Sequence, residues 1–276
     1  MQQHRSQFHI NVFDVDAYGE LRANGLLRFL QQTASDASAA VGYDVEWYEQ
    51  AGTMWVIRRT IVDFLEPVFY RDDIEVRTWV SDIRRVRSQR EYEVRRTRDA
   101  AVVARGSTDW VYVDLARGAP ARPPDEMRER LLPNVGAQPR PPPAAAAPPA
   151  HAAAAQRRVE LADLDAVAHV NNAHYAVYVE QAVYDALASR GWRIEPQLRS
   201  ARLRVLRHDL EYFAEAQYDD RLDAAMWTTA LAGNSFGSEC LLMRDGTRVL
   251  HGSSRWQWTG AELPAELRAA LSALSG

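Results

Sequence analysis

The residues best suited to chemistry lie in one short stretch, Asp163–Tyr175, which reads D-L-D-A-V-A-H-V-N-N-A-H-Y. Asp165 and His169 are four residues apart in what we expect to be a loop, so both side chains can converge on one carbon. A carboxylate and an imidazole are groups that move protons near neutral pH. The alternative is that Asn171 or Asn172 merely caps the following helix, as isolated asparagines commonly do.

The helix expected after this loop, over about residues 172–190, adds a second chemical feature. The first turn of a helix leaves backbone N–H groups without intrahelical partners, and the helix dipole makes that end positive. Such donors can stabilise a carbonyl oxygen that gains negative charge when its carbon is attacked. The sequence therefore predicts a loop that combines acid–base groups with an oxyanion site.

A further carboxylate, Glu215, continues the strand expected over residues 201–213, on the face that carries Phe213. On a half-buried face the pKa of a carboxyl group rises, which favours a role as general base. The alternative is a solvated glutamate at the end of the strand, because Asp219 and Asp220 follow closely.

An internal repeat with a period near 147 residues organises the chain. The stretch 14–17 recurs at 163–166, and 106–110 recurs at 252–256. Each copy predicts a short strand (7–13 and 157–161), then one long helix (24–41 and 172–190). Four further strands follow in each copy, over 54–66, 73–83, 88–98 and 101–113, and over 201–213, 221–232, 236–244 and 248–258.

One long helix wrapped by an antiparallel sheet resembles the hotdog architecture. We therefore expect an α+β fold of the tandem (double) hotdog type, with the two sheets joined side by side. The expected parts are a first hotdog over residues 1–132, a Pro/Ala-rich linker over 133–156, and a second hotdog over 157–276.

The two copies are not equivalent in chemistry. Asp16 persists in the first copy, but Glu20 stands at the position of His169 and Leu26 at that of Tyr175. Val68 is the residue that we match to Glu215. We therefore expect one active site per chain, built on the second copy.

Composition narrows the classes of protein. The chain has 276 residues, of which 47% are hydrophobic and 25% charged, with a formal net charge of −4. The single cysteine, Cys240, excludes an internal disulfide and a multi-cysteine metal site. His9, His208 and His251 have no partners at metal-ligand spacing, so we expect no metal and no cofactor.

The charge and the apolar runs also exclude some partners. Mild acidity argues against nucleic acid as the main partner. No run of apolar residues reaches the roughly 18 that a membrane helix needs, and the N-terminal residues carry no apolar signal core. We expect a cytoplasmic protein without a membrane partner, either a monomer or a homodimer.

The stretch Asp163–Tyr175 resembles the signature of the fatty acyl-ACP thioesterases of the plant FatA/FatB type and their bacterial relatives. More loosely, it is similar to the 4-hydroxybenzoyl-CoA thioesterase superfamily. The resemblance extends to 210–220, 78–81 and 30–34. It implies a hydrolase of fatty acid biosynthesis that cleaves acyl-ACP, with acyl carrier protein as the substrate carrier and the first copy holding the acyl chain.

The resemblance also implies residue roles. Glu215 is implied to be the base that activates water, or the nucleophile itself. Asp165 is implied to orient the site or share the proton work, and His169 to donate to the thioester oxygen. Two departures stand out: Val167 replaces the family's asparagine, and Ala216 replaces its cysteine. A papain-like mechanism at that position is therefore excluded.

Several interpretations stay open at this stage. Arg157 and Arg158, with Asn171 and Asn172, are candidate substrate-binding residues, the arginines for a phosphopantetheine phosphate. Rival functions are an acyl-CoA thioesterase, a non-catalytic acyl-ACP or acyl-CoA binding module, and a hotdog dehydratase. His174 fits a surface or packing residue better than a second catalyst.

An arginine-rich hairpin in the first copy is a possible landing surface for an acidic carrier protein or for coenzyme A phosphates. The alternative is a solvated strand pair in a chain whose basic residues are all arginine. The arginines are Arg84, Arg85, Arg87, Arg90, Arg95, Arg96 and Arg98.

Overall fold

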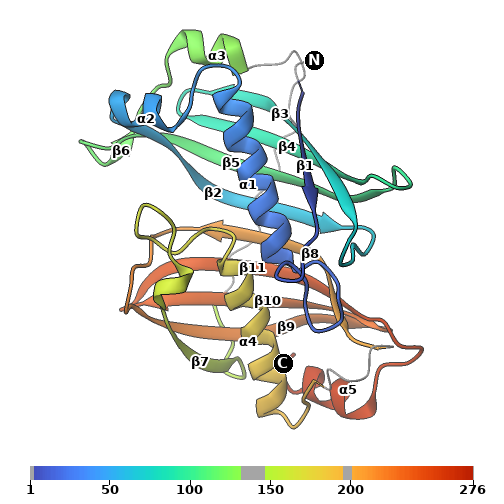
Figure 1. The fold of residues 1–276 in the computed structure, drawn as a ribbon. Helices are drawn as coiled ribbons and strands as arrows, with labels where there is room; N and C mark the ends of the chain where they lie inside the picture. The colour runs from blue at the N-terminus through green and yellow to red at the C-terminus, as the bar shows by residue number, and fades with distance from the viewer. Residues whose placement is uncertain (1–2, 132–146, 195–200, 276) are drawn as a thin grey trace. The chain divides into compact units, whose positions relative to one another are not determined.

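The chain divides into two compact units, Met1–Pro141 and Pro142–Gly276. The computed structural model describes residues 3–131, 147–194 and 201–275. Most of the predicted linker, residues 132–146, therefore lies outside the described residues. Each unit has its own long helix and its own antiparallel sheet (Figure 1).

The sheet of the first unit has the strand order β1-β3-β4-β5-β2, with a short β6 paired to β5. All of these pairs are antiparallel. The strands are β1 (His4–His9), β2 (Thr53–Phe64), β3 (Asp73–Arg84), β4 (Arg87–Arg96), β5 (Val102–Asp114) and β6 (Ala119–Pro120).

The sheet of the second unit repeats that order as β7-β9-β10-β11-β8, again with antiparallel pairs. The strands are β7 (Ala153–Arg158), β8 (Leu203–Tyr212), β9 (Arg221–Ala232), β10 (Ser235–Arg244) and β11 (Thr247–Trp258). Because each strand occupies the place of its counterpart, the structure supports the repeat predicted from the sequence.

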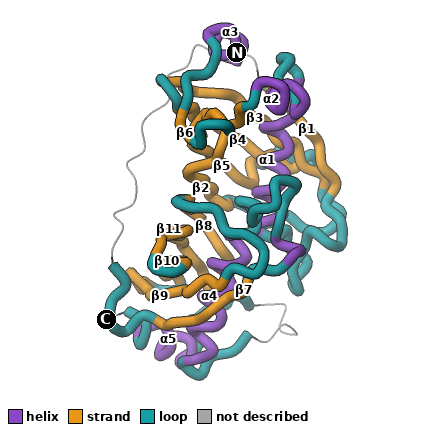
Figure 2. Tube along the Cα trace, turned by 90° about the vertical axis from the view of Figure 1, so that its left-hand side faces the viewer, coloured by secondary structure: helices purple, strands orange, loops and turns teal. Residues whose placement is uncertain are grey.

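One long helix packs on each sheet: α1 (Ala23–Ala39) in the first unit and α4 (Tyr175–Ser189) in the second. Figures 1 and 2 show each helix lying against the strands of its own unit. Apolar residues at helical spacing are buried on both, as expected for an amphipathic helix. The buried residues of α1 include Leu26, Leu27, Leu30, Ala34 and Ala37, and those of α4 include Ala176, Val179, Val183 and Leu187.

The first strand of each unit begins earlier than the sequence predicted. β1 ends at His9, because Asn11 N–H bonds to the Asp14 carboxylate (2.9 Å) and turns the chain. β7 begins at Ala153, inside the predicted linker, because its alanines pair with β9 through the backbone. Small side chains made this segment look like a connector, but strand pairing at a sheet edge needs no large apolar groups.

Three short helices were not predicted: α2 (Val45–Ala51), α3 (Asp125–Leu131) and α5 (Ala265–Ser272). In the first unit, Met127 of α3 and Trp47 of α2 join an aromatic cluster with Tyr43 and Tyr112. Helices α2 and α3 therefore share one hydrophobic cluster of the first unit. No helix within the described ranges is long and apolar enough to cross a membrane.

Candidate active site

The loop that carries the candidate catalytic residues is closed by its own backbone. The N–H of Asp165 donates to the carbonyl of His169 (2.9 Å), and the N–H of Ala168 donates to the carbonyl of Asp165 (3.0 Å). Ala168 takes a left-handed conformation with φ of 63°, which is unfavourable for a residue with a Cβ atom. The turn therefore holds Asp165 and His169 at fixed places.

A backbone bridge brings Glu215 to His169. His169 pairs with Gln217 as an isolated antiparallel bridge, and the N–H of Val170 donates to the carbonyl of Ala216 (2.9 Å). As a result the Nε2 atom of His169 lies 3.2 Å from a carboxylate oxygen of Glu215. The side chains are 28% and 62% exposed, respectively, so both remain accessible to a substrate.

Glu215 does not lie on a half-buried strand face as predicted. β8 ends at Tyr212, and Glu215 follows it as an exposed residue. The interpretation as a solvated glutamate accounts for its exposure, but not for its contact with the imidazole. An exposed carboxylate beside a histidine is an acid–base pair that water can reach.

Gln217 is a site residue that the sequence reasoning missed. Its side-chain amide nitrogen lies 3.4 Å from the same Nε2 atom of His169. The sequence signal was available, because a residue two positions after Glu215 in an extended segment points to the same side. The contact with His169 itself depends on the bridge between two distant segments.

Among the described residues, Asp165 contacts His169 only through backbone atoms. Its carboxylate accepts the N–H of Val167 (3.1 Å), which closes an Asx-type turn. Val167 itself is 55% exposed. The structure thus brings His169 and Glu215 together and gives Asp165 a local role in shaping the loop.

Beneath the loop, Asp163 is the centre of a buried polar network. Its carboxylate accepts the backbone N–H of Glu160 (2.8 Å) and the hydroxyl of Tyr178 (2.5 Å), and lies 2.7 Å from Nε2 of His174. Burial raises the pKa of Tyr178, so its hydroxyl stays a donor. The guanidinium carbon of Arg157 lies 4.2 Å from the ring centroid of Tyr178 in a cation–π contact.

His174 is therefore a half-buried member of a network and not a surface residue. Desolvation lowers its pKa below the ordinary value for histidine, against the opposing effect of the Asp163 carboxylate. The network connects the loop to α4, because His174 is the residue before the first turn of that helix and Tyr178 lies within it.

The start of α4 offers fewer oxyanion donors than predicted. Asn171 accepts the N–H of Ala173 on its side chain (2.9 Å) and the N–H of His174 on its carbonyl (2.8 Å). The N–H of Ala176 bonds to the carbonyl of Ala173 (3.3 Å). Asn171 thus organises the turn, which is why α4 begins at Tyr175 and not at Asn172.

The other candidate binding residues lie near the loop and differ in the contacts that they make. Arg158 forms an ion pair with Asp219. The Nε atom of Arg157 is buried and has no hydrogen-bond partner among the described residues. The backbone carbonyl of Asn172 accepts the hydroxyl of Tyr212 (3.1 Å), and Asn172 is half-buried.

Tyr175 is buried at the start of α4, and burial raises its pKa. The Ala216 backbone and the Glu215 carboxylate both contribute to the electrostatic environment of its hydroxyl.

The first unit has the same loop without the imidazole–carboxylate pair. Glu20 pairs with Phe69 as His169 pairs with Gln217, and the N–H of Leu21 donates to the carbonyl of Val68 (2.7 Å). Val68 therefore matches Ala216, and Pro67 matches Glu215, one residue from the match made on the sequence. Asp16 again closes the turn, by accepting the N–H of Tyr18 (2.8 Å).

Two further histidines of the second unit contact carboxylates in the interior. His208 lies between the hydroxyl of Ser254 (2.8 Å) and a carboxylate oxygen of Glu180 (3.1 Å). Nε2 of His251 lies 2.7 Å from Glu239. Ser254 is only 4% exposed, so this serine–histidine–glutamate row is closed to substrate.

Cys240 is fully buried, as predicted, and burial raises the pKa of its thiol to about 12. A thiol in this state is not a nucleophile near neutral pH.

The arginine-rich hairpin does not form the uniform basic surface that a landing site requires. Arg84 pairs with Asp82 (2.8 Å), Arg95 with Glu93 (2.7 Å) and Arg98 with Asp72 (2.9 Å). Arg90 and Arg96 are buried and face the interior of the unit.

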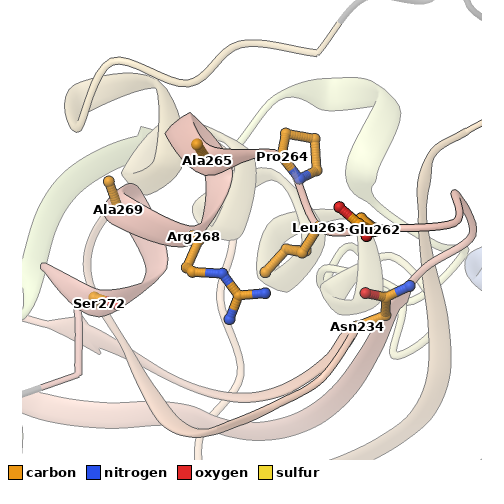
Figure 3. Close-up of a pocket in the computed structure, with 8 residues that line it drawn as sticks. All are labelled: Asn234, Glu262, Leu263, Pro264, Ala265, Arg268, Ala269 and Ser272. Carbon is orange, nitrogen blue, oxygen red and sulfur yellow. The ribbon is translucent and has the colours of Figure 1, made fainter.

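A pocket of about 810 Å³ lies beside α5, and Figure 3 shows the residues that line it. Its Asn234 amide already donates to the carbonyls of Gly260 (2.9 Å) and Ala261 (3.2 Å). The pocket contains none of the candidate catalytic residues, being lined by Asn234, Glu262, Leu263, Pro264, Ala265, Arg268, Ala269 and Ser272.

Comparison with known proteins bears on this site. Residues 1–131 match the model of the acyl-ACP thioesterase N-terminal domain. An oleoyl-acyl carrier protein thioesterase of Arabidopsis thaliana is 21% identical over 255 residues, covering 85% of this chain and 66% of that protein. A palmitoyl-acyl carrier protein thioesterase of the same plant is 24% identical, covering 91% of this chain and 63% of that protein.

The chain spans slightly less than two thirds of these curated relatives. Among solved structures, an acyl-ACP thioesterase of Bacteroides thetaiotaomicron superposes with a TM-score of 0.73 at 18% identity, covering 92% of this chain and 98% of that chain. The 12:0-ACP thioesterase of Umbellularia californica gives a TM-score of 0.70 at 19% identity, covering 93% and 94%.

These structural likenesses first define the class: the chain has the fold of the acyl-ACP thioesterases, with antiparallel strands and few helices. The family follows from the sequence matches. Residues 1–131 match the acyl-ACP thioesterase N-terminal domain, and the curated relatives extend that likeness over most of the chain. The resemblance inferred from the sequence is confirmed.

Proposed function

We propose that the protein hydrolyses the thioester of a fatty acyl-ACP to a free fatty acid and the carrier thiol. The observation that carries the proposal is the contact between His169 and Glu215, 3.2 Å apart at a loop fixed by a backbone bridge. The matched relatives are named as thioesterases of acyl carrier proteins, which supports this substrate class.

In the proposed reaction, the Glu215 carboxylate takes a proton from water while the water oxygen attacks the thioester carbon. The Nε2–H of His169 donates to the carbonyl oxygen as it becomes negative. Collapse of the tetrahedral intermediate breaks the carbon–sulfur bond, and the thiolate takes up the proton. Glu215 as nucleophile is the alternative route, in which an acyl-glutamate anhydride forms first and water then cleaves it.

We also infer the roles of the parts. The two units are a tandem hotdog, in which the second carries the chemistry and the first holds the acyl chain. Asp165 shapes the loop or shares the proton work, while Arg157, Arg158, Asn171 and Asn172 surround the carrier arm. The cytoplasmic location, the absence of a membrane partner, and a monomeric or homodimeric state stay predictions.

The proposal is tested by thiol release from a panel of acyl-ACPs. Glu215→Gln and His169→Ala are each expected to lower kcat by at least about 100-fold, since general acid–base catalysis contributes roughly that much. The matched control is Glu20→Gln, at the loop position of the first unit that corresponds to His169, which is expected to keep near wild-type rates. Wild-type rates in Glu215→Gln and His169→Ala would remove both residues from the mechanism.

A second candidate is a module that binds acyl-ACP or acyl-CoA without turnover. The observation that favours it is Val167, which is 55% exposed at the position where the family has an asparagine. In that case the panel gives tight binding without thiol release. An acyl-CoA thioesterase, the nearby variant, would release thiol from acyl-CoA in preference to acyl-ACP.

A further inference from the structure

The first unit buries an arginine without an acidic partner. Arg90 is 7% exposed and lies on the inward face of β4, which also carries Tyr92, Val94 and Arg96. Glu91 and Glu93 belong to the opposite face of the same strand, because side chains alternate along a strand. The guanidinium of Arg90 is therefore turned into a unit in which we expect an acyl chain.

The hydrogen bonds of Arg90 are far from complete. Among the described residues, its guanidinium makes one hydrogen bond, from Nη1 to the hydroxyl of Thr78 at 3.4 Å. That distance exceeds the usual range for an N–H···O hydrogen bond, and a guanidinium has five N–H groups to satisfy. The remaining 7% of accessible surface shows that atoms of the size of water still reach this side chain.

Arg96, six residues further along the same face of the strand, is an arginine of this unit whose hydrogen bonds are satisfied. Its Nε and Nη2 atoms donate to the carboxylate of Asp99 (3.0 and 2.8 Å), and its Nη1 donates to the carbonyl of Pro67 (2.8 Å). Arg96 thus has the bidentate partner that Arg90 lacks.

The groups around Arg90 are hydroxyls. The charged and titratable neighbours that act on it within the described residues are Tyr92 and Tyr48. The hydroxyl of Tyr92 is 3.1 Å from that of Thr108. Burial lowers the pKa of Arg90, because no anion nearby compensates for the lost hydration. A buried charge without a counterion destabilises a fold, so the fold itself gains nothing from this arginine.

The second unit shows that the fold does not require an arginine at the position of Arg90. Arg90 pairs with Thr108 across the sheet, and at the corresponding place Ser238 pairs with Ser254. Ser238 is a small residue that accepts the indole N–H of Trp256 (2.9 Å). The same position therefore folds well with a small neutral side chain.

We propose that Arg90 is a carboxylate-binding residue, and that the acyl group accepted by this protein carries a second carboxylate remote from its thioester. A carboxylate matches the planar fork of a guanidinium in two parallel hydrogen bonds, and the hydroxyl of Tyr92 can donate a further one. The proposal rests on the proposed function for the thioester end of the ligand, but the binding of the carboxylate can be measured without turnover.

Binding is tested on the full chain by calorimetry with three ligands of equal chain length: the monomethyl ester of an α,ω-dicarboxylic acid, its dimethyl ester, and the methyl ester of the simple fatty acid. Wild type is expected to bind the monomethyl ester at least about tenfold more tightly than the other two, as for a hydrogen bond to a charged group. Arg90→Met and Arg90→Gln are expected to lose that preference, and Arg96→Met to keep it. Equal binding of all three ligands by wild type overturns the proposal.

Stability separates a binding role from a structural one. Arg90→Met is expected to leave Tm unchanged or raise it, since an apolar side chain replaces an uncompensated charge. Arg96→Met is expected to lower Tm, because it removes a paired arginine and leaves Asp99 without its partner. A fall in Tm for Arg90→Met as large as that for Arg96→Met would show a structural role and overturn the proposal.

Turnover adds a measurement that separates this inference from the proposed function. The ratio of kcat/KM for an ω-carboxyacyl-ACP over the plain acyl-ACP is expected to fall at least about tenfold in Arg90→Met. If this ratio stays at its wild-type value, Arg90 does not bind the carboxylate, and the proposed hydrolase function is unaffected. If no thioester is cleaved at all, the hydrolase fails, and the binding preference for the monomethyl ester still decides the role of Arg90.

Discussion

At the scale of the residue, the candidate site depends on one imidazole and one carboxylate that the chain brings together from distant segments. His169 and Glu215 are 3.2 Å apart, and Gln217 reaches the same imidazole nitrogen. Both residues are accessible, so a substrate can reach the pair that they form. Position 167 of the loop is a valine and carries no side-chain amide. A substitution at this position therefore tests whether an amide there contributes to the reaction.

Val167→Asn is expected to raise kcat for acyl-ACP hydrolysis by about tenfold or more, because one well-placed amide donor is worth roughly 10²-fold in comparable sites. The side chain is 55% exposed, so the change costs little packing. Thiol release under saturating substrate is the measurement, with Ala166→Asn at the neighbouring exposed position as the control. An unchanged kcat in Val167→Asn would mean that this position takes no part in the reaction.

His174 predicts a pH dependence of stability. Desolvation lowers its pKa in the folded state, whereas in the unfolded chain it titrates near its ordinary value of 6.5. As pH falls through about 6.5, the unfolded state takes up a proton that the folded state does not, so the free energy of unfolding decreases. Above that pH this contribution to stability is fully present.

The groups that act on His174 are Asp163, Arg157 and Glu160. Urea unfolding between about pH 5 and pH 8 is expected to show a shallower fall in stability for His174→Gln than for wild type, with His4→Gln as the control. A fall as steep in His174→Gln as in wild type would assign the effect to other groups.

The sequence predicted His169 and Glu215 as site residues, but it did not predict the residues that surround them. His169 was singled out by residue types and spacing in its loop, and a resemblance to a family signature then implied the roles of His169 and Glu215. The Asp163 network was missed because the contacts with Tyr178 and Arg157 join a loop, a helix and an edge strand. No local pattern reports such contacts, so they become visible only when the elements are packed.

At the scale of the element, periodicity predicted the long helices and the long strands well. β9 was expected over 221–232 and occupies those residues, and β5 differs by one residue at each end. The short helices α2, α3 and α5 were missed because seven or eight residues give too few turns for an apolar period to emerge.

Two matched glycines show how closely the elements pack. A Cβ atom on Gly252 of β11 would lie 2.9 Å from a methyl of Val179 on α4, and one on Gly106 of β5 would lie 3.0 Å from the carbonyl of Ile61. Both glycines were sequence landmarks of the repeat. The structure gives the reason, since each permits close approach of a neighbouring element.

Gly252→Ala is accordingly expected to lower the free energy of unfolding by about 1–3 kcal/mol, the usual cost of forcing an extra group into a packed interior. Urea denaturation is the measurement. Thr247→Ala, at the exposed start of the same strand, is the control and is expected to change stability by less than about 0.5 kcal/mol. If Gly252→Ala is as stable as the control, α4 does not pack on β11 as closely as described.

At the scale of the whole molecule, the chain is a repeat. Its two units share the same arrangement of elements but differ in the residues of their loops and interiors. The loop bridges of the two units match, as Glu20–Phe69 matches His169–Gln217. Yet the first unit has Pro67 where the second has Glu215, and it holds the buried Arg90 where the second has Ser238. The second unit therefore holds the candidate acid–base pair, and the first unit holds a buried arginine.

This asymmetry predicts one site per chain. Calorimetric titration of the full chain with an acyl-ACP thioether, in which the scissile thioester is replaced by a stable bond, is expected to give a stoichiometry near one per chain. Two equal sites would be expected only if both loops bound the thioester end, and the first loop has neither the imidazole nor the carboxylate. Glu215→Gln should retain this stoichiometry while losing turnover, because the substitution removes a proton acceptor and preserves the shape of the loop. A stoichiometry of two would mean that the first unit binds the carrier arm as well, and the division of roles between the units would have to be abandoned.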